Sequence, residues 1–196
     1  MYAFLSRVNM REYPKNQRAH VVGVERKTDK EWLLTLDGPT PAFEQNDVID
    51  NITWNPNITV RNNQVDMDPV RGFLLGTRGK IAVEGNTLNC KMSGILVEGD
   101  AARWMESSPV RDMLIQKNHF IHCGIAVGAS VKNIKPEEPI HENIRIADYE
   151  FEGGGITIRG TRGVTVKDNF SLKQDLSIKL EDSCTETRVE GNQIKQ

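Results

Sequence analysis

The feature that most constrains this chain of 196 residues is a six-residue phrase that recurs from residue 58 onward. Each copy has an apolar residue or threonine, an apolar residue two positions later and, in most copies, a final asparagine. The copies read ITVRNN (58–63), IAVEGN (81–86), MLIQKN (113–118), VTVKDN (164–169) and TRVEGN (187–192), with a degenerate IRIADY (144–149). Their last positions, which we call the markers, are 23, 32, 31, 20 and 23 residues apart. Self-similarity of this kind predicts a repeat architecture.

A second phrase, glycine followed by an apolar segment, comes after the markers. It reads GFLL (72–75), GILV (94–97), GIAV (124–127) and GITI (155–158), and the last copy, LSI (176–178), lacks the glycine. Each unit therefore carries two or three short β-segments of period 2, separated by Asn and Gly turns. Such a unit is shorter than the roughly 30 residues of a βαβ unit, and the leucine-rich consensus is absent. The sequence predicts an all-β fold, a parallel β-helix of about six coils.

The marker asparagines are expected at one corner of the coils, because asparagine tolerates the left-handed conformation and bonds local backbone. Asn63, Asn86 and Asn118 fall on successive coils, so their side chains are expected to bond one another along the helix. The two long intervals predict insertions of roughly 8–10 residues, within 99–110 and 129–140. Loops inserted at one turn of a solenoid usually form its binding face.

The first 46 residues do not follow the repeat. Residues 20–25 and 32–36 read as two strands around a polar turn, and GPTP (38–41) interrupts the chain. We therefore expect two parts, a partial antiparallel β module over 1–46 and the parallel β-helix over 47–196.

Composition and charge narrow the function classes. A formal net charge of −2 and a pI of about 6.1 argue against a nucleic-acid partner. No run approaches 18 apolar residues, so no membrane span is expected, and no secretory signal is visible at the start. Three cysteines without CxxC spacing predict neither a disulfide framework nor a zinc site. His119 and His122 face opposite ways on a strand, and the DxD at 66–68 lacks a calcium-loop context; no metal or cofactor is expected.

The densest group of chemically active side chains lies in EGDAARWMESSPVRD (98–112), on the first predicted insertion. Asp100 and Glu106 are the candidate catalytic carboxylates, and Trp104 is a candidate sugar platform, since an indole stacks on a pyranose while carboxylates bond hydroxyls or transfer protons. Adjacent coils lie about 4.8 Å apart, so the scaffold can set the carboxylate spacing of either glycosidase class. The alternative is that these acids are solvated and Trp104 covers the side of a coil.

One coil earlier, DMDPVRGFLLGTRGK (66–80) supplies further candidate substrate ligands. Arg71 and Arg78 flank the predicted strand 73–75, and an arginine fork suits carboxylates or sugar hydroxyls. Asp66 is a third candidate. The alternative is that Arg71 only pairs with Asp66 or with the carboxylate at position 68.

Residues 47–120 resemble the C-terminal β-helix of glycoside hydrolase family 110, bacterial exo-acting α-1,3-galactosidases. The resemblance is firm for about 47–125. The marks that carry it are Asn51, Thr53, Trp54, Pro56, Arg71, Gly72, Thr77, Arg78, Gly79, Lys80, Gly99, Asp100, Ala101, Trp104, Glu106, Ser107 and Val110. It implies a right-handed parallel β-helix, an inverting hydrolase acting on terminal galactose of glycans, and a secreted or periplasmic location for full-length members; the location of this chain stays open.

Departures from the family pattern are equally informative. Family members are about three times as long, and an upstream Asp-Asp phrase followed by Asn-x-His-Gly looks like part of their catalytic centre. Neither phrase occurs here. The resemblance therefore implies a C-terminal fragment that lacks part of the catalytic centre. Three hypotheses remain: a glycoside hydrolase of this type, a non-catalytic carbohydrate-binding or structural β-helix, and, less well supported, a pectin-active enzyme. Self-association is expected through exposed strand edges at the solenoid end.

Overall fold

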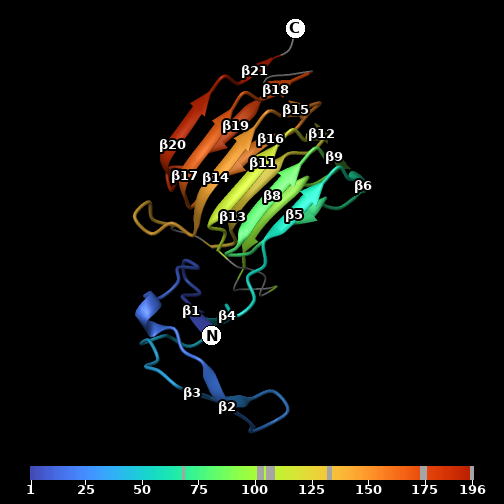
Figure 1. Cartoon of the computed structure of the whole chain (residues 1–196). Coiled ribbons are helices and arrows are strands. Elements are labelled where there is room, and N and C mark those ends of the chain that lie inside the picture. The colour runs from blue at the N-terminus through green and yellow to red at the C-terminus, as the bar shows by residue number, and fades with distance from the viewer. Residues whose placement is uncertain (68, 101–103, 105–108, 132–133, 173–175, 195–196) are drawn as a thin grey trace.

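The computed structural model describes residues 1–67, 69–100, 104, 109–131, 134–172 and 176–194. Their regular structure is almost entirely β, with one short 3₁₀ helix, η1 (Lys15–Gln17). From residue 58 onward the strands form three parallel sheets, which together we call the stack (Figure 1). The expectation of an all-β fold with parallel sheets is confirmed.

Successive strands along the chain belong to the first, second and third sheet in rotation. We call each such round of the chain, which adds one strand to each sheet, a pass. The first sheet contains β5 (Ile58–Arg61), β8 (Lys80–Glu84), β11 (Asp112–Gln116), β14 (His141–Ala147), β17 (Thr161–Lys167) and β20 (Thr185–Glu190). The second contains β6 (Gln64–Met67), β9 (Thr87–Cys90), β12 (His119–Ile121), β15 (Glu150–Phe151), β18 (Phe170–Ser171) and β21 (Gln193–Ile194). The third contains β7 (Phe73–Leu74), β10 (Ile95–Gly99), β13 (Ile125–Ala129), β16 (Gly155–Ile158) and β19 (Ser177–Leu180).

The register aligns the apolar positions of the repeat into columns that fill the interior. In the first sheet one column is Val60, Val83, Ile115, Ile146, Val166 and Val189. In the second sheet the column two residues after the markers is Val65, Leu88, Phe120, Phe151, Ser171 and Ile194. The middle members of these columns are fully buried, whereas Val189 and Ile194 of the last pass are half exposed. The stack thus buries its apolar face only by repetition.

The marker asparagines form the predicted ladder at one corner. The backbone N–H and Nδ2 of Asn63 donate to Asn86 Oδ1 at 3.0 and 2.9 Å, and those of Asn86 donate to Asn118 Oδ1 at 3.0 and 2.8 Å. The same pair of bonds runs from Asn169 to Asn192 at 3.2 and 2.7 Å. Stacked side-chain amides therefore bond from pass to pass at this corner.

The left-handed conformation lies one residue before each marker, not at the marker itself as the sequence suggested. Asn62, Gly85, Lys117, Asp148, Asp168 and Gly191 all have φ between 53° and 66°. This residue turns the corner, and the turn lets the following asparagine point inward and reach its neighbours. The position accepts Gly, Asn and Asp readily, and Lys117 shows that a longer side chain is also held there.

The N-terminal part is a separate antiparallel module. β1 (Tyr2–Leu5) pairs with β4 (Val48–Asn51), and β2 (Val21–Arg26) pairs with β3 (Trp32–Leu36), which confirms the predicted hairpin. β4 follows the boundary expected at residue 46 and pairs with β1 of the module. Apolar side chains join the module to the ends of the parallel strands in a small second core: Leu5, Met10, Ala129, Val131 and Ile140, with Val48 and Ile134 against them.

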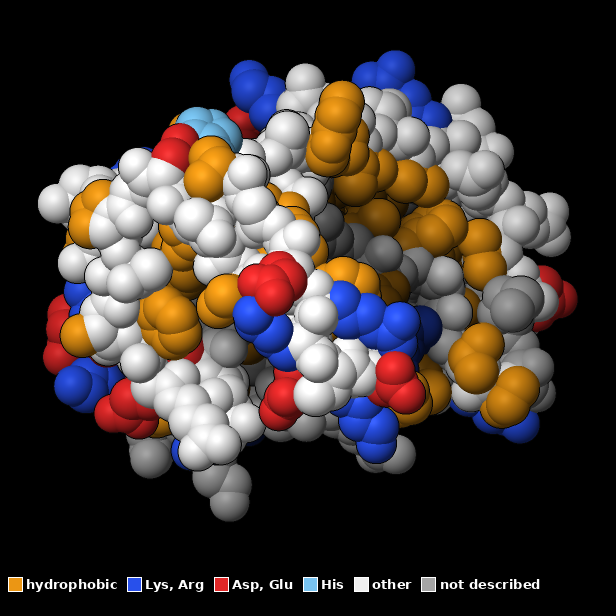
Figure 2. All heavy atoms as spheres, turned by 90° about the horizontal axis from the view of Figure 1, so that it is seen from below, with side chains coloured by type: hydrophobic (Ala, Val, Ile, Leu, Met, Phe, Trp, Pro, Cys, Tyr) orange, Lys and Arg blue, Asp and Glu red, His pale blue; other side chains and the backbone are white. Residues whose placement is uncertain are grey.

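The two predicted insertions are confirmed as the connections from β10 to β11 and from β13 to β14. Both follow the carboxyl ends of β10 and β13, which are parallel neighbours in the third sheet. Seen from below, the surface is hollowed, with hydrophobic side chains around the hollow and acidic and basic side chains beside it (Figure 2). Nothing in the described part of the chain forms a helix long and apolar enough to cross a bilayer.

Candidate functional site

A cavity of about 380 Å³, which we call the junction pocket, lies where the antiparallel module meets the end of β10. Its lining residues are Met10, Asn46, Asp47, Val48, Ile49, Asp50 and Asp100. Two of its carboxylates come from the strand β4 and the turn before it, and the third follows β10. Asp100, a candidate from the sequence, therefore shares a pocket with Asp47 and Asp50, which the sequence did not single out.

Asp47 is held by three hydrogen-bond donors. Its Oδ1 accepts the Arg7 backbone N–H at 2.9 Å, and its Oδ2 accepts the Glu44 N–H at 2.9 Å and the Tyr13 hydroxyl at 2.8 Å. Burial alone would raise the pKa of Asp47, but these donors favour the charged form and lower the pKa below its ordinary value. Asp47 is therefore a fixed negative charge at the pocket wall, suited to binding rather than to donating a proton.

Asp100 and Trp104 are the two described sequence candidates in the first insertion. Asp100 is 5% exposed, and its Oδ2 accepts the backbone N–H of Trp104 at 3.1 Å. Trp104 is 63% exposed, which makes it accessible to a ligand. The bond between them fixes the backbone of Trp104 to the Asp100 carboxylate. Glu106, the second catalytic candidate, lies outside the described residues.

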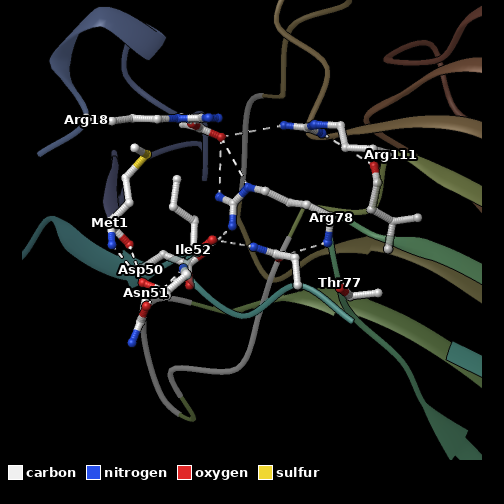
Figure 3. Close-up of polar contacts among 12 residues, drawn as sticks. Met1, Arg18, Asp50, Asn51, Ile52, Thr77, Arg78 and Arg111 are labelled. Carbon is white, nitrogen blue, oxygen red and sulfur yellow. Dashed lines mark hydrogen bonds and ion pairs between the residues drawn. The ribbon is translucent and has the colours of Figure 1, made fainter. Parts of the chain in front are cut away.

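Arg78 belongs to an ion-pair cluster between the module and the first passes of the stack (Figure 3). Its Nε and Nη2 donate to Glu12 Oε2, each at 3.3 Å, and its Nη1 donates to Asp50. Arg18 contacts Glu12 from the other side, and Arg111 Nη2 lies 3.9 Å from it. The Arg78 side chain is only 9% exposed. Its donors are directed at carboxylates of the module, and its expected role as a sugar ligand stays a prediction.

The two remaining candidates lie away from the junction pocket. Arg71 is half-buried in the turn before β7, at one edge of the third sheet. Asp66 is exposed on β6, in the second sheet, and accepts a bond from Asn89 Nδ2 at 3.0 Å. The structure therefore brings together Asp100 and Trp104, places Arg78 at the module interface, and separates Arg71 and Asp66 from them.

His141 ties the bases of the two insertions together. Its Nδ1 accepts the Val110 N–H at 3.2 Å, and its Nε2 donates to the Gly128 carbonyl at 2.7 Å. The ring is 1% exposed. Burial lowers the pKa of His141 from 6.5 to about 4, so the ring is neutral at neutral pH. The two partners of His141 are 31 and 13 residues away along the chain, so no local sequence pattern reports these contacts.

The stability of the protein is expected to fall as the pH drops from about 6.5 to 4. In that window the unfolded chain protonates His141 while the folded chain keeps it neutral, so unfolding takes up a proton. The expected loss is about 3 kcal/mol of unfolding free energy. Urea denaturation of wild type, His141→Gln and the exposed control His20→Gln at pH 7 and pH 4 measures it. An equal fall in His141→Gln would contradict the assignment.

The described residues contain no group of three His, Cys, Asp or Glu side chains arranged to hold an ion. His119 Nε2 instead lies 2.9 Å from Glu152 Oε1. The three cysteines are free thiols. Cys123 donates to the Leu88 carbonyl at 3.3 Å, and burial raises its pKa to about 12, which keeps the thiol protonated and unreactive.

Comparison with known proteins decides what this architecture is related to. No family model matches the chain. "Alpha-1,3-galactosidase A" of Akkermansia muciniphila is 39% identical over 168 residues, which is 81% of this chain and 28% of that protein. The chain is homologous to alpha-1,3-galactosidases. The protein of the same name from Bacteroides thetaiotaomicron is 32% identical over 184 residues, covering 86% of this chain and 32% of that protein. "Alpha-1,3-galactosidase B" of Bacteroides thetaiotaomicron is 34% identical over 158 residues, 73% of this chain and 26% of that protein.

The chain spans about 30% of the length of the alpha-1,3-galactosidases it matches. These identities support the resemblance to glycoside hydrolase family 110 that the phrases around Arg71, Arg78 and Trp104 indicated. The residues that sequence reasoning missed, Asp47 and Asp50, occur in the segment NDVIDN (46–51). Its polar and apolar residues do not alternate, and only the pairing of β4 with β1 shows that a strand carries Asp50 to the pocket.

Proposed function

We propose that this chain is the C-terminal part of a glycan-active protein of the family 110 type, and that its substrate is a terminal α-galactoside. The observation that carries the proposal is the 39% identity to an alpha-1,3-galactosidase over 81% of the chain. The three stacked parallel sheets support the finer fold proposal, a right-handed parallel β-helix over 47–196 preceded by a module over 1–46. We place the catalysis of the complete enzyme partly in residues beyond this chain.

The junction pocket is the proposed sugar site. Trp104 is exposed, and its backbone N–H bonds Asp100, which lines the pocket. In this proposal the indole offers a flat apolar surface to one face of a pyranose, while Asp100 accepts hydroxyl groups at the pocket wall. Glu106 is proposed as the second carboxylate. Arg71, Arg78 and Asp66 are weaker proposals, because they lie outside the pocket lining.

The alternative is a carbohydrate-binding or structural module without turnover. One observation favours it: Asp47 and Asp50 are engaged by donors, Asp47 by Arg7, Glu44 and Tyr13, and Asp50 by Arg78. A general acid must exchange its proton with the substrate, and a carboxylate fixed by charge-assisted bonds is poorly suited to that role.

The test combines a chromogenic α-galactoside with direct measurement of methyl α-galactoside binding by NMR. We expect binding, and a roughly tenfold weaker affinity in Trp104→Ala, because about 1.4 kcal/mol of stacking corresponds to a factor of ten. Trp32→Ala is the matched control, since Trp32 is similarly exposed (57%) but lies on the distant β2–β3 hairpin.

Hydrolysis of the α-galactoside that is lost in Asp100→Asn supports the proposal of an enzyme. Binding of methyl α-galactoside without hydrolysis supports the alternative, a module without turnover. Absence of any galactoside binding, or binding that Trp104→Ala leaves unchanged, contradicts the proposed site. Both variants require an unchanged amide spectrum away from the pocket, because Asp100 also bonds the loop backbone.

A further inference from the structure

A second hollow lies on the outer face of the third sheet, away from the junction pocket lining. A groove of about 280 Å³ runs across β10, β13, β16 and the end of β19, and its polar walls are Glu98, Thr157, Arg159 and Glu181. It shares Arg159 and Glu181 with a larger cavity of about 620 Å³, which continues toward Lys179 and Ser183. The two hollows therefore form one continuous depression along the sheet.

The groove exists because β13 carries almost no outward side chain. Ala126 and Gly128 are its two outward positions, and Gly128 pairs in register with Glu98 on β10. A Cβ on Gly128 would lie 2.7 Å from Cγ and Nε of Arg159, so the arginine stem lies directly across the glycine. Glu98 and Arg159 thus face each other across one strand, about 10 Å apart at the backbone from the spacing of neighbouring strands.

The guanidinium of Arg159 has no ion pair or hydrogen bond among the residues that the structure describes, although the side chain is half-buried. Its backbone is fixed, because the Arg159 N–H donates to the Val127 carbonyl at 3.0 Å. A guanidinium carries five donors in a planar fork. Partial burial of such a fork without acceptors is costly unless a ligand or water supplies them.

The acceptors on either side complete the pattern. Glu98 accepts the Ser130 hydroxyl on one wall, and Glu181 lies 3.6 Å from Lys179 on the other. The Arg159 guanidinium thus lies between two carboxylates, and this order of acceptor, donors and acceptor matches the vicinal hydroxyls of a neutral pyranose. The side chains of Leu96 and Ala126 form an apolar floor that matches the apolar face of the sugar. Two carboxylates beside the arginine disfavour a free anion.

We propose that this groove is a secondary binding site for a neutral hexopyranose unit of a glycan, with Arg159 as the principal donor. The choice of a glycan rests on the proposed function, whereas the groove is a separate site whose lining does not include Asp100 or Trp104. A chain with both sites would contact an extended glycan at two points, which raises its apparent affinity without a new contact at either site.

Titration of the ¹⁵N-labelled chain with the disaccharide galactosyl-α-1,3-galactose tests the proposal. Chemical-shift changes are expected at the amides of Ala126, Gly128 and Thr157. The affinity for the disaccharide should be reduced about tenfold or more in Arg159→Gln. Arg162→Gln is the matched control, because Arg162 is an exposed arginine on β17 that pairs with Glu142. An unchanged amide spectrum of Arg159→Gln without sugar establishes that the variant is folded.

The outcomes separate this proposal from the preceding one. Shifts confined to the surroundings of Asp100 and Trp104 overturn the groove and leave the proposed function intact. Shifts at the groove that persist in Trp104→Ala and disappear in Arg159→Gln support the groove even if the junction pocket binds nothing. Groove shifts that Arg159→Gln leaves unchanged, or galacturonate binding there at least tenfold more tightly than galactose, overturn the assignment of a neutral sugar to Arg159.

Discussion

Replacing Asn118 by alanine is expected to lower the unfolding free energy by about 3–5 kcal/mol, because several buried polar groups lose their partners at once. Asn118 Nδ2 donates to the carbonyls of Val83 and Gln116, each at 2.9 Å. Its Oδ1 accepts both the backbone N–H and the Nδ2 of Asn86. Asn118 and Asn86 are 2% and 1% exposed, so water cannot replace these bonds without opening the corner.

Chemical denaturation followed by circular dichroism measures this effect, with Asn89→Ala as the matched control. Asn89 lies on β9, one repeat earlier, and the side-chain bond it makes within the described part of the chain goes to the exposed carboxylate of Asp66, so less than about 1 kcal/mol should be lost. Equal losses in the two variants would show that the ladder bonds contribute no more than a surface contact. Asn118→Asp places a carboxylate oxygen against the carbonyls of Val83 and Gln116, so at neutral pH it should destabilise the protein at least as much as Asn118→Ala if these donor bonds matter.

Replacing Arg78 by alanine is expected to loosen the antiparallel module from the stack at a cost of about 3–5 kcal/mol, the usual range for removing one partner of a buried ion pair. The Arg78 side chain and that of Glu12 are each 9% exposed, and Asp50 is 15% exposed. Without the cation between them, the two carboxylates repel each other in a region of low dielectric constant. The apolar contacts around Met10 and Val48 and the pairs that Glu138 makes with Asn9 and Arg11 remain at the interface.

Hydrogen exchange gives a local readout for this variant. Amides of β1 and β4 should exchange faster in Arg78→Ala, while those of β14 and β17, in the middle of the stack, keep their protection. Arg188→Ala is the control, because Arg188 is 70% exposed and its pair with Glu190 should contribute less than about 1 kcal/mol. Unchanged exchange in β1 and β4 would contradict a role for Arg78 in holding the module.

The sequence predicted the parallel part of the fold well because its signal is local and repeated. Period-2 apolar residues and the marker asparagines define the strands of the first two sheets, and the register then follows from stacking like on like. Tyr149 shows the limit: it stands at a marker position, yet its N–H still donates to Asn169 Oδ1 at 3.2 Å. The ladder therefore tolerates the loss of one amide side chain.

The candidate site was predicted only in part, because most of it depends on contacts between distant segments. Asp100 and Trp104 stand in one insertion and were found from composition. By contrast, Asp50 meets Arg78 across 28 residues and Glu12 meets it across 66. No local pattern reports such a pairing. Arg159 was missed for the same reason, since its groove arises from the register of four strands.

The asparagine ladder also gives the stack a direction. In the rungs from Asn63 to Asn118 and from Asn169 to Asn192, the donors belong to the earlier pass and the oxygen to the later one. The two ends are therefore chemically unlike, with the Asn63 oxygen at one and the Asn192 amide at the other. The ladder can continue between two copies only where the Asn192 end of one meets the Asn63 end of the other. The self-association expected for this chain would therefore be heterologous and would grow by addition of further copies. It would not close as a symmetric dimer.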